Sequence, residues 1–228
     1  MKKIATNLAS VRHRIAAAAL RAGRAPDEIA LVTVAKTQPI AAVREAVAAG
    51  AVIIGENYIQ EARAKFDALI DKQVQWHFIG HLQSNKAKIA VRIFDLIHSV
   101  DSVKLARQID KQAQKAGKIQ DILVQVNMGG ENSKSGVAPA AAMDLIAESV
   151  TLTHIRLQGL MTMPPFFDAP DRARPFFAEL RSLRERAAQS LGITLPHLSM
   201  GMTGDFEIAI QEGATLVRIG TAIFGERG

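Results

Sequence analysis

Three things are scarce in this chain of 228 residues: cysteine, aromatic residues and long apolar runs. Cysteine is absent, so disulfides, thiolate catalysis and zinc–thiolate sites are excluded, and the composition fits a reducing compartment. Aromatic residues make up only 5% of the chain, which leaves few platforms on which nucleic acid bases would stack. We therefore expect neither thiol chemistry nor nucleic acid binding.

The apolar stretches are short. The longest ones, residues 29–35 and 221–225, fall far below the length of a membrane-spanning helix. The first residues do not have the form of a secretory leader, because Lys2 and Lys3 are followed by an amphipathic pattern with basic residues at 12–14. These features predict a cytoplasmic protein with no membrane partner.

The composition is that of a globular protein with one sizeable core. Hydrophobic residues make up 48% of the chain and charged residues 22%, and 228 residues is an ordinary length for a single α/β barrel. The net charge of +6 comes from Lys and Arg residues that are interspersed with acids, as on a solvated surface. We therefore expect one domain over residues 1–228.

Short β-rich apolar runs alternate along the chain with longer stretches of helical period. An amphipathic helix comes first, with Ile4, Leu8, Val11 and Ile15 on one face, and it ends near Gly23. Strands are then predicted at residues 30–35, 52–55, 75–79, 96–100, 122–127, 155–161, 197–200 and 215–219. Helices are predicted after Pro39, over 57–71, from Ser84 and Asn85, from a cap at Asp101, after Pro139, around 176–191 and over 204–211. Every strand except the last is thus followed by a helix.

This alternation predicts the α/β class and a closed (β/α)8 TIM barrel with an extra N-terminal helix. An open, doubly wound sheet is the alternative, since it is built from the same alternation. In a barrel, functional residues gather just past the carboxyl ends of the strands. That rule selects a set expected to face one mouth: Lys36, Glu56, Asn57, His81, Lys134, Met163, residues 199–203 and residues 218–221.

Lys36 ends an almost wholly apolar strand segment, residues 31–36. Partial desolvation at such a position favours a neutral amine, which is the form that attacks an aldehyde to make a Schiff base. A lysine that simply leaves the strand for solvent is the alternative interpretation, and position alone favours it.

Two strand-to-helix turns have the composition of a phosphate-binding site. Residues 199–205 read Ser-Met-Gly-Met-Thr-Gly-Asp and supply glycines, hydroxyls and N–H groups, while residues 217–221 end the next strand. Barrels commonly bind phosphate after their seventh and eighth strands, so the two turns support one another. The alternative is that Gly201 and Gly204 are ordinary turn residues.

Arg218 lies inside the last apolar strand, where a charge is costly unless it is paired or directed at a ligand. An ion pair with Glu207 or Glu212 and a contact to a ligand are equally good interpretations.

Other polar residues are given structural interpretations. Lys134 lies in a polar loop, where a solvated lysine is the default. His77 and His81 are four apart, but the residues between them read as strand end and turn, so the pair does not share a helix face and no metal site is predicted. His77 and Trp76 are expected to be packed.

Several segments of the chain are specific enough to carry a family resemblance. They read Val-Ala-Lys-Thr at 34–37, Gly-Glu-Asn-Tyr at 55–58, Trp-His-Phe-Ile-Gly-His-Leu-Gln-Ser-Asn-Lys at 76–86, Glu-Asn-Ser-Lys-Ser-Gly at 131–136, Gly-Leu-Met-Thr-Met at 159–163, Ser-Met-Gly-Met at 199–202 and Val-Arg-Ile-Gly-Thr-Ala-Ile-Phe-Gly at 217–225. Together they span nearly the whole chain and closely resemble the pyridoxal phosphate homeostasis protein family. That family resembles the barrel domain of alanine racemase, a fold-type III pyridoxal phosphate barrel.

The resemblance implies a cofactor, pyridoxal 5′-phosphate, and a role for individual residues. Lys36 would form the Schiff base and Arg218 would approach the pyridine nitrogen, which weakens the ring as an electron sink. The remaining cofactor-binding residues are Ser199, Thr203, Gly220 and Thr221 at the phosphate, Gly201 in the same turn, Met163 against the ring and Asn57 nearby. No catalytic residue and no metal ligand is assigned.

The sequence departs from the family pattern at three positions. Ala35 and Thr203 stand where many relatives have serine, and His81 replaces a common proline. The Thr203 hydroxyl preserves the phosphate donor, so cofactor binding is still expected.

These implications predict a carrier that holds the cofactor reversibly and maintains its supply without evident catalysis, with apoenzymes as candidate recipients. The resemblance suggests a monomer or weak dimer. Racemases of this fold need a second acid–base residue, which the resemblance places in a further C-terminal domain and the partner subunit, whereas this sequence ends at Gly228, soon after its eighth strand. The rival hypothesis is a weak racemase of small amino acids in which Tyr58 or His81 supplies that group.

Overall fold

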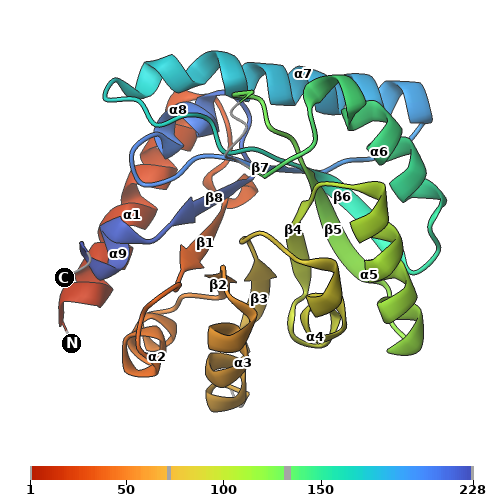
Figure 1. Cartoon of the computed structure of the whole chain (residues 1–228). Helices are drawn as coiled ribbons and strands as arrows, with labels where there is room; N and C mark the ends of the chain where they lie inside the picture. The colour runs from red at the N-terminus through yellow and green to blue at the C-terminus, as the bar shows by residue number, and fades with distance from the viewer. Residues whose placement is uncertain (1, 71–72, 131–134, 227–228) are drawn as a thin grey trace.

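The computed structural model describes residues 2–70, 73–130 and 135–226. Its centre is a closed barrel of parallel strands that pair in sequential order, with β8 returning to β1 (Figure 1). The strands are β1 Ala30–Val34, β2 Ile53–Glu56, β3 Gln75–Phe78, β4 Leu96–Val100, β5 Gln120–Gln125, β6 Ile155–Met161, β7 His197–Ser199 and β8 Leu216–Ile219. The predicted TIM barrel is confirmed, and the open-sheet alternative is wrong because β1 pairs with β8.

The helices surround the barrel on its outside. They are α1 Lys2–Arg21, α2 Ile40–Ala48, α3 Ile59–Ala68, α4 Ala87–Ile93, α5 Val103–Lys115, α6 Pro139–Thr151, α7 Arg174–Leu191, α8 Phe206–Gln211 and α9 Thr221–Phe224, with 3-10 turns η1 Pro26–Glu28, η2 Ser84–Lys86 and η3 Pro170–Ala173. Among the residues described, none of these helices combines the length and the apolar character needed to cross a bilayer.

Two predicted details are wrong. The N-cap of α5 is Ser102 and not Asp101: the Ser102 hydroxyl accepts the backbone N–H of Leu105 at 3.3 Å, which satisfies one of the orphan donors of the first turn. The last strand is also followed by a helix, the short α9.

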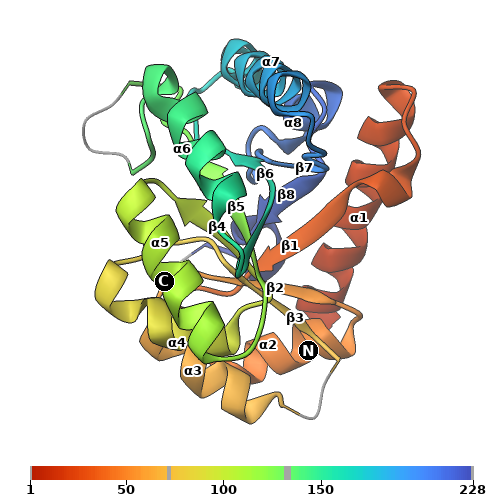
Figure 2. The same cartoon turned by 90° about the vertical axis from the view of Figure 1, so that its right-hand side faces the viewer.

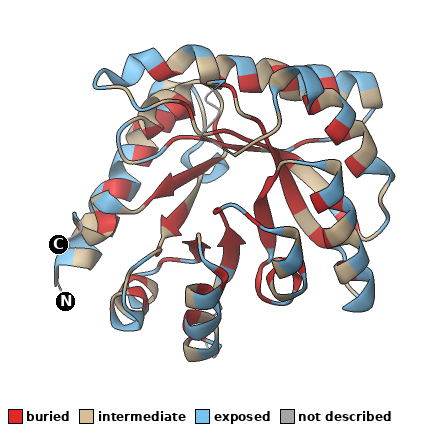
Figure 3. Ribbon diagram, in the orientation of Figure 1, coloured by how far each residue is buried: buried red, intermediate tan, exposed pale blue. Residues whose placement is uncertain are grey.

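The side chains of each strand alternate between the barrel interior and the helical layer. An inner apolar cluster contains Val32, Ile53, Ile79, Leu96, Leu123, Met161 and Leu216. The residues between them face outward, as Trp76 and Phe78 of β3 do, with Trp76 edge-on to Phe66 of α3 at a ring distance of 5.9 Å. The expected packing of Trp76 is confirmed. Figure 3 shows the result, with buried strands inside and exposed outer helix faces.

The extra helix α1 occupies the place that the eighth helix of the barrel would take. It lies along α8 and α9, and Figure 2 shows it on the flank beside β1. Asn7 of α1 donates its side-chain N–H to the carbonyl of Ile223 at 2.9 Å, and Arg14 pairs with Glu207 of α8 at 2.6 Å. The first helix therefore covers the seam at which the barrel closes.

One glycine is required by the strand packing. The pairing of β5 with β6 shifts register between Ile122 and Leu123, and Gly159 of β6 lies at this irregularity with φ of 153°. A Cβ atom at this position would overlap the carbonyl oxygen of His197 in β7. Gly159 thus lets β6 and β7 approach each other, which brings the ends of both strands to the same mouth.

We predict that Gly159→Ala lowers the free energy of unfolding by about 3 kcal/mol or more, since the backbone of β7 would have to move. Gly117→Ala is the matched control: it also lies at positive φ, but nothing lies within 4 Å of its added Cβ. That change should cost only about 1–2 kcal/mol. Urea unfolding of both variants measures the difference, and equal losses would contradict the packing argument.

Candidate functional site

A cavity of about 410 Å³ lies at the carboxyl ends of the strands. Most of the predicted cofactor residues line it: Lys36, Asn57, Met163, Thr203, Arg218, Gly220 and Thr221. Its volume is within the range of small-molecule sites. Another hollow, of about 370 Å³, lies between α1 and the amino ends of β1 and β2. Barrels do not carry their functional groups at that end, so the first cavity is the candidate site.

Lys36 reaches the cavity because of strand alternation. Val32 and Val34 of β1 belong to the barrel interior, so the residue two positions further on is directed to the same side. Lys36 lines the cavity and is half-buried, so it does not simply leave the strand for solvent. The next residue, Thr37, has φ of +63°, a left-handed conformation that is uncommon for a residue with a Cβ. A strained turn therefore fixes the end of β1.

A buried ion pair supports this turn from outside the barrel. The Lys65 ammonium of α3 donates to the Glu56 carboxylate at 2.6 Å and to the carbonyl of Ala35 at 2.7 Å. Glu61 accepts the backbone N–H of Thr37 at 2.8 Å. Burial raises the pKa of Glu56, although the hydrogen bond from Lys65 opposes that change. The expectation that Glu56 faces the mouth is therefore wrong, because strand alternation turns it toward α3.

Arg218 is a buried cation that forms no ion pair within 4.0 Å among the described residues, although the charge of the nearby Asp205 favours its protonated form. Its side chain is 3% exposed, and it donates to the Ser199 hydroxyl at 2.6 Å and to the carbonyl of Thr162 at 2.9 Å. Burial lowers the pKa of Arg218 to about 10. A buried charge hydrogen-bonded to neutral acceptors and facing a cavity fits a site that receives an acceptor or an anion.

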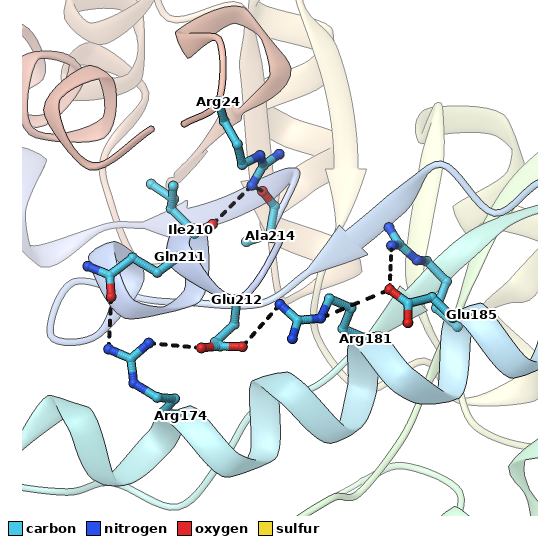
Figure 4. A network of polar contacts seen from close by, with 9 residues as sticks. Arg24, Arg174, Arg181, Glu185, Ile210, Gln211, Glu212 and Ala214 are labelled. Carbon is cyan, nitrogen blue, oxygen red and sulfur yellow. Dashed lines mark hydrogen bonds and ion pairs between the residues drawn. The ribbon is translucent and has the colours of Figure 1, made fainter. Parts of the chain in front are cut away.

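The ion-pair interpretation of Arg218 is wrong. Glu212 is held instead by Arg174 at 2.8 Å and Arg181 at 3.1 Å, both of α7, as Figure 4 shows. Glu207 pairs with Arg14. Both acids thus serve the packing of helices around the barrel, while Arg218 remains directed at the cavity.

Two turns present backbone N–H groups to the cavity. Thr203 and Gly204 follow β7, and Gly220 and Thr221 follow β8. In the described part of the chain, none of these four N–H groups donates to another residue. Together with the Thr203 and Thr221 hydroxyls, they suit an anion with several oxygen acceptors, such as a phosphate.

Ser199 and Gly201 are not brought to the cavity wall. Ser199 is fully buried below it, where its hydroxyl contacts His98 at 2.8 Å as well as Arg218. Gly201 packs against α8, where an added Cβ would lie 2.6 Å from the Cβ of Ala209. Both residues thus lie behind the cavity wall, and the phosphate contact of Ser199 and the cofactor-binding role of Gly201 stay predictions.

Some residues of the cavity were not selected from the sequence. One wall is formed by the Pro-Pro-Phe-Phe run at 164–167, in which Phe166 is 87% exposed. The run begins shortly after the end of β6, so the rule that functional residues follow strand ends could have selected it. Asp205 also lines the cavity; its carboxylate accepts the Met202 N–H at 2.6 Å, and burial raises its pKa.

Tyr58 and His81 lie in a neighbouring hollow of about 210 Å³, which shares Asn57 with the main cavity. The exposed His81 ring is 3.1 Å from the Ser135 hydroxyl and 3.6 Å from Asp101. His77 points into the barrel, so the two histidines do not form a pair. Lys134 lies outside the described residues. Within the described ranges, no group of three or more His, Asp or Glu side chains could hold a metal ion.

His77 and His98 are buried inside the barrel below the cavity, with ring nitrogens 3.0 Å apart. Burial lowers the pKa of His77 to about 3, and the pKa of His98 lies well below its ordinary value for the same reason. Besides burial, the charges of His77, Arg218 and His197 lower the pKa of His98, while His197 lowers and Asp121 raises the pKa of His77. Both rings are therefore neutral near neutral pH.

Comparison with known proteins places this geometry in a family. The sequence model of the alanine racemase N-terminal domain matches residues 6–228. A protein of Aquifex aeolicus called pyridoxal phosphate homeostasis protein is 46% identical over 220 residues, covering 96% of each chain. A protein of Pseudomonas aeruginosa with the same name is 46% identical over 228 residues, covering 100% of this chain and 97% of the relative.

Solved structures agree with these sequence matches. PipY of Synechococcus elongatus, solved with PLP bound, superposes with a TM-score of 0.86 at 38% identity, covering 97% of this chain and all of PipY. Alanine racemase of Clostridium difficile superposes with a TM-score of 0.75 at 14% identity, covering 100% of this chain and 57% of the racemase. The second likeness concerns the fold alone.

We predict that Lys65→Met lowers the free energy of unfolding by about 3–5 kcal/mol, because it leaves the Glu56 carboxylate buried without its cation. Adding Glu56→Gln should recover part of this loss, since it removes the uncompensated charge. Lys88→Met on the exposed face of α4 is the control and should change stability by no more than about 0.5 kcal/mol. A Lys65→Met variant as stable as the control would contradict the assignment.

The neutral histidines predict a pH dependence. Between about pH 6.5 and pH 3 the unfolded chain binds a proton at His77 that the folded chain does not, so stability falls as the pH drops through this window. Between pH 7 and pH 5 this one residue should account for about 2 kcal/mol. His77→Gln should remove this contribution to the pH dependence of stability. Glu56 and Asp205 have raised pKa values and so stabilise the fold as the pH falls, but they do so equally in the wild type and the variant. Unfolding at the two pH values tests this, and the exposed His13→Gln should retain the wild-type dependence.

Proposed function

This chain belongs to the pyridoxal phosphate homeostasis protein family, and we propose that it carries pyridoxal 5′-phosphate reversibly as a Schiff base on Lys36 and supplies the cofactor without turning over a substrate. One observation carries the proposal: a lysine amine, a buried arginine that forms no ion pair in the described chain and two turns of unbonded N–H groups line the same cavity.

Each part of the cofactor has a suitable counterpart among the residues of this chain. When bound, the cofactor supplies an aldehyde for reversible attachment to an amine and, in enzymes, an electron sink. Lys36 would hold the aldehyde carbon, and Thr203, Gly204, Gly220 and Thr221 would hold the phosphate. Met163 and Ile79 offer apolar surface to the ring, as is usual in small-molecule sites.

Arg218 supports the non-catalytic part of the proposal. A guanidinium has only N–H donors and keeps its charge, so it can bind an unprotonated ring nitrogen but gives no proton to it. Amino-acid chemistry on this cofactor depends on withdrawing electrons into the ring, and a protonated nitrogen strengthens that effect. An arginine in this position would therefore disfavour transaminase-like chemistry.

The access to the cavity supports release. Lys36 is half-buried and the exposed Phe166 forms part of the rim, so a small molecule at Lys36 is near solvent. Exchange of the lysine amine for a free amine needs only such access. We propose that apoenzymes that need the cofactor are the recipients and that the chain acts as a monomer or weak dimer.

A racemase would need a second acid–base group beside Lys36. The candidates Tyr58 and His81 line the neighbouring hollow and not the cavity that holds Lys36. Asp205, the acid that does line the cavity, is engaged by the Met202 N–H. This arrangement favours the carrier over the enzyme.

We predict that wild-type protein mixed with pyridoxal phosphate develops the visible absorption band of a protonated Schiff base and that Lys36→Ala does not. Borohydride reduction followed by mass mapping should place the cofactor on Lys36. Lys88→Ala, an exposed lysine of α4, is the control and should keep the band.

An adduct mapped to another residue would show that the assigned site is wrong. Sustained racemisation of a small amino acid by purified protein, lost in Lys36→Ala and in Tyr58→Phe or His81→Gln, would instead overturn the non-catalytic part of the proposal.

A further inference from the structure

A line of polar side chains runs down the barrel interior from the cavity. Much of the surrounding interior is apolar, with Val32, Leu123 and Leu216 among its members. The line consists of Arg218 next to the cavity, then Ser199 and His98, and His77 at the far end. Each of these four residues is at most 4% exposed. Polar groups in such surroundings are costly unless each hydrogen bond is made, so their arrangement is well determined.

Three short contacts connect the line. Arg218 donates to the Ser199 hydroxyl at 2.6 Å, Ser199 contacts Nδ1 of His98 at 2.8 Å, and Nε2 of His98 contacts Nδ1 of His77 at 3.0 Å. These residues come from β8, β7, β4 and β3, and the contact between Ser199 of β7 and His98 of β4 crosses the barrel between strands that are not neighbours.

The direction of the hydrogen bonds follows from the charged end. Arginine only donates, so Ser199 accepts from it and keeps one hydroxyl proton to give. The acceptor available to that proton is Nδ1 of His98. His98 must then carry its proton on Nε2, which it donates to Nδ1 of His77.

The reverse direction is disfavoured. If Nδ1 of His98 donated to Ser199, the serine oxygen would accept twice and its hydroxyl proton would have no described acceptor in a fully buried position. An unsatisfied buried donor costs about 1–3 kcal/mol. A charged ring would keep the same conflict, because its Nδ1–H would also donate to Ser199, and it would add a cation beneath Arg218, which the low dielectric of the interior opposes.

We propose that Ser199, His98 and His77 are positioning residues that hold the Arg218 guanidinium in one orientation. Their hydrogen bonds all run in one direction, from Arg218 to His77, and both histidines are neutral and protonated on Nε2. In this arrangement Ser199 and the carbonyl of Thr162 take one donor each from the two terminal nitrogens of Arg218. Because Arg218 also lines the cavity, an N–H donor not used in these two bonds could serve a ligand atom that accepts hydrogen bonds. The link from Arg218 to the cofactor ring rests on the proposed function, whereas the line itself does not.

The line is tested first in cofactor-free protein. Nitrogen NMR of labelled histidine distinguishes protonated from unprotonated ring nitrogens, and the His98→Gln and His77→Gln variants assign the signals. We expect both rings to be neutral with the proton on Nε2. A proton on Nδ1 of His98, or a charged ring at neutral pH, would overturn the proposal whether or not the protein binds pyridoxal phosphate.

The positioning role is tested with the loaded protein. Ser199→Ala should weaken pyridoxal phosphate binding about tenfold, which corresponds to about 1.4 kcal/mol, and should shift the visible maximum of the bound cofactor and its pH titration. Ser199→Thr keeps the hydroxyl and should restore the wild-type spectrum. Ser99→Ala is the matched control, because Ser99 is a buried serine of β4 whose hydroxyl has no hydrogen-bond partner in the described chain.

The outcomes separate the two proposals. If Ser199→Ala has the spectrum and the affinity of Ser99→Ala, the positioning role is wrong while the carrier function stands. If wild-type protein forms no adduct on Lys36, the carrier function fails, and the histidine tautomers in the cofactor-free protein still decide whether the line exists.

Discussion

Closure of the parallel barrel is the constraint on which the site depends. Because side chains alternate along each strand and the eight strands enclose one interior, residues that are far apart in sequence must share a small volume. Lys36 and Arg218 reach the same cavity for this reason, one just past β1 and the other from β8, two strands that become neighbours only when the barrel closes. The same alternation turns Glu56 away from the cavity and gives it a role in supporting the turn after Lys36.

Two buried cations in this protein show different electrostatic solutions. Lys65 is compensated by Glu56, and the pair connects α3 with the end of β1. Arg218 is hydrogen-bonded to neutral groups, which hold it in place without cancelling its charge. The paired cation supports the turn after Lys36, whereas a buried cation that faces a cavity with no ion pair is a candidate for binding a ligand. The contrast between the two explains why only one of them belongs to the candidate site.

The sequence predicted the elements of this fold well and their cross-barrel contacts poorly. Periodicity predicted each strand of the barrel, and the predicted bounds of β4 and β6 are those observed. This succeeded because short apolar runs that alternate with stretches of helical period are a local property of the sequence. The strand-end rule likewise selected Lys36 and Arg218. His98 was not selected, since its partner Ser199 is 101 residues away and the contact exists only across a closed interior. Ser199 itself was placed at the phosphate, because a sequence does not tell how deep in the barrel a residue lies.

The position of α1 has a consequence for synthesis of the chain. This first helix packs on α8 and α9, and Asn7 bonds to Ile223 near the other end of the sequence. On the ribosome α1 is made long before α8 and α9. Its packing face therefore stays exposed to solvent until these last elements have left the exit tunnel. The seam between β1 and β8 closes at the same late moment and brings Arg218 beside Lys36. The cavity between Lys36 and Arg218 is therefore assembled only after β8 has been made and has paired with β1.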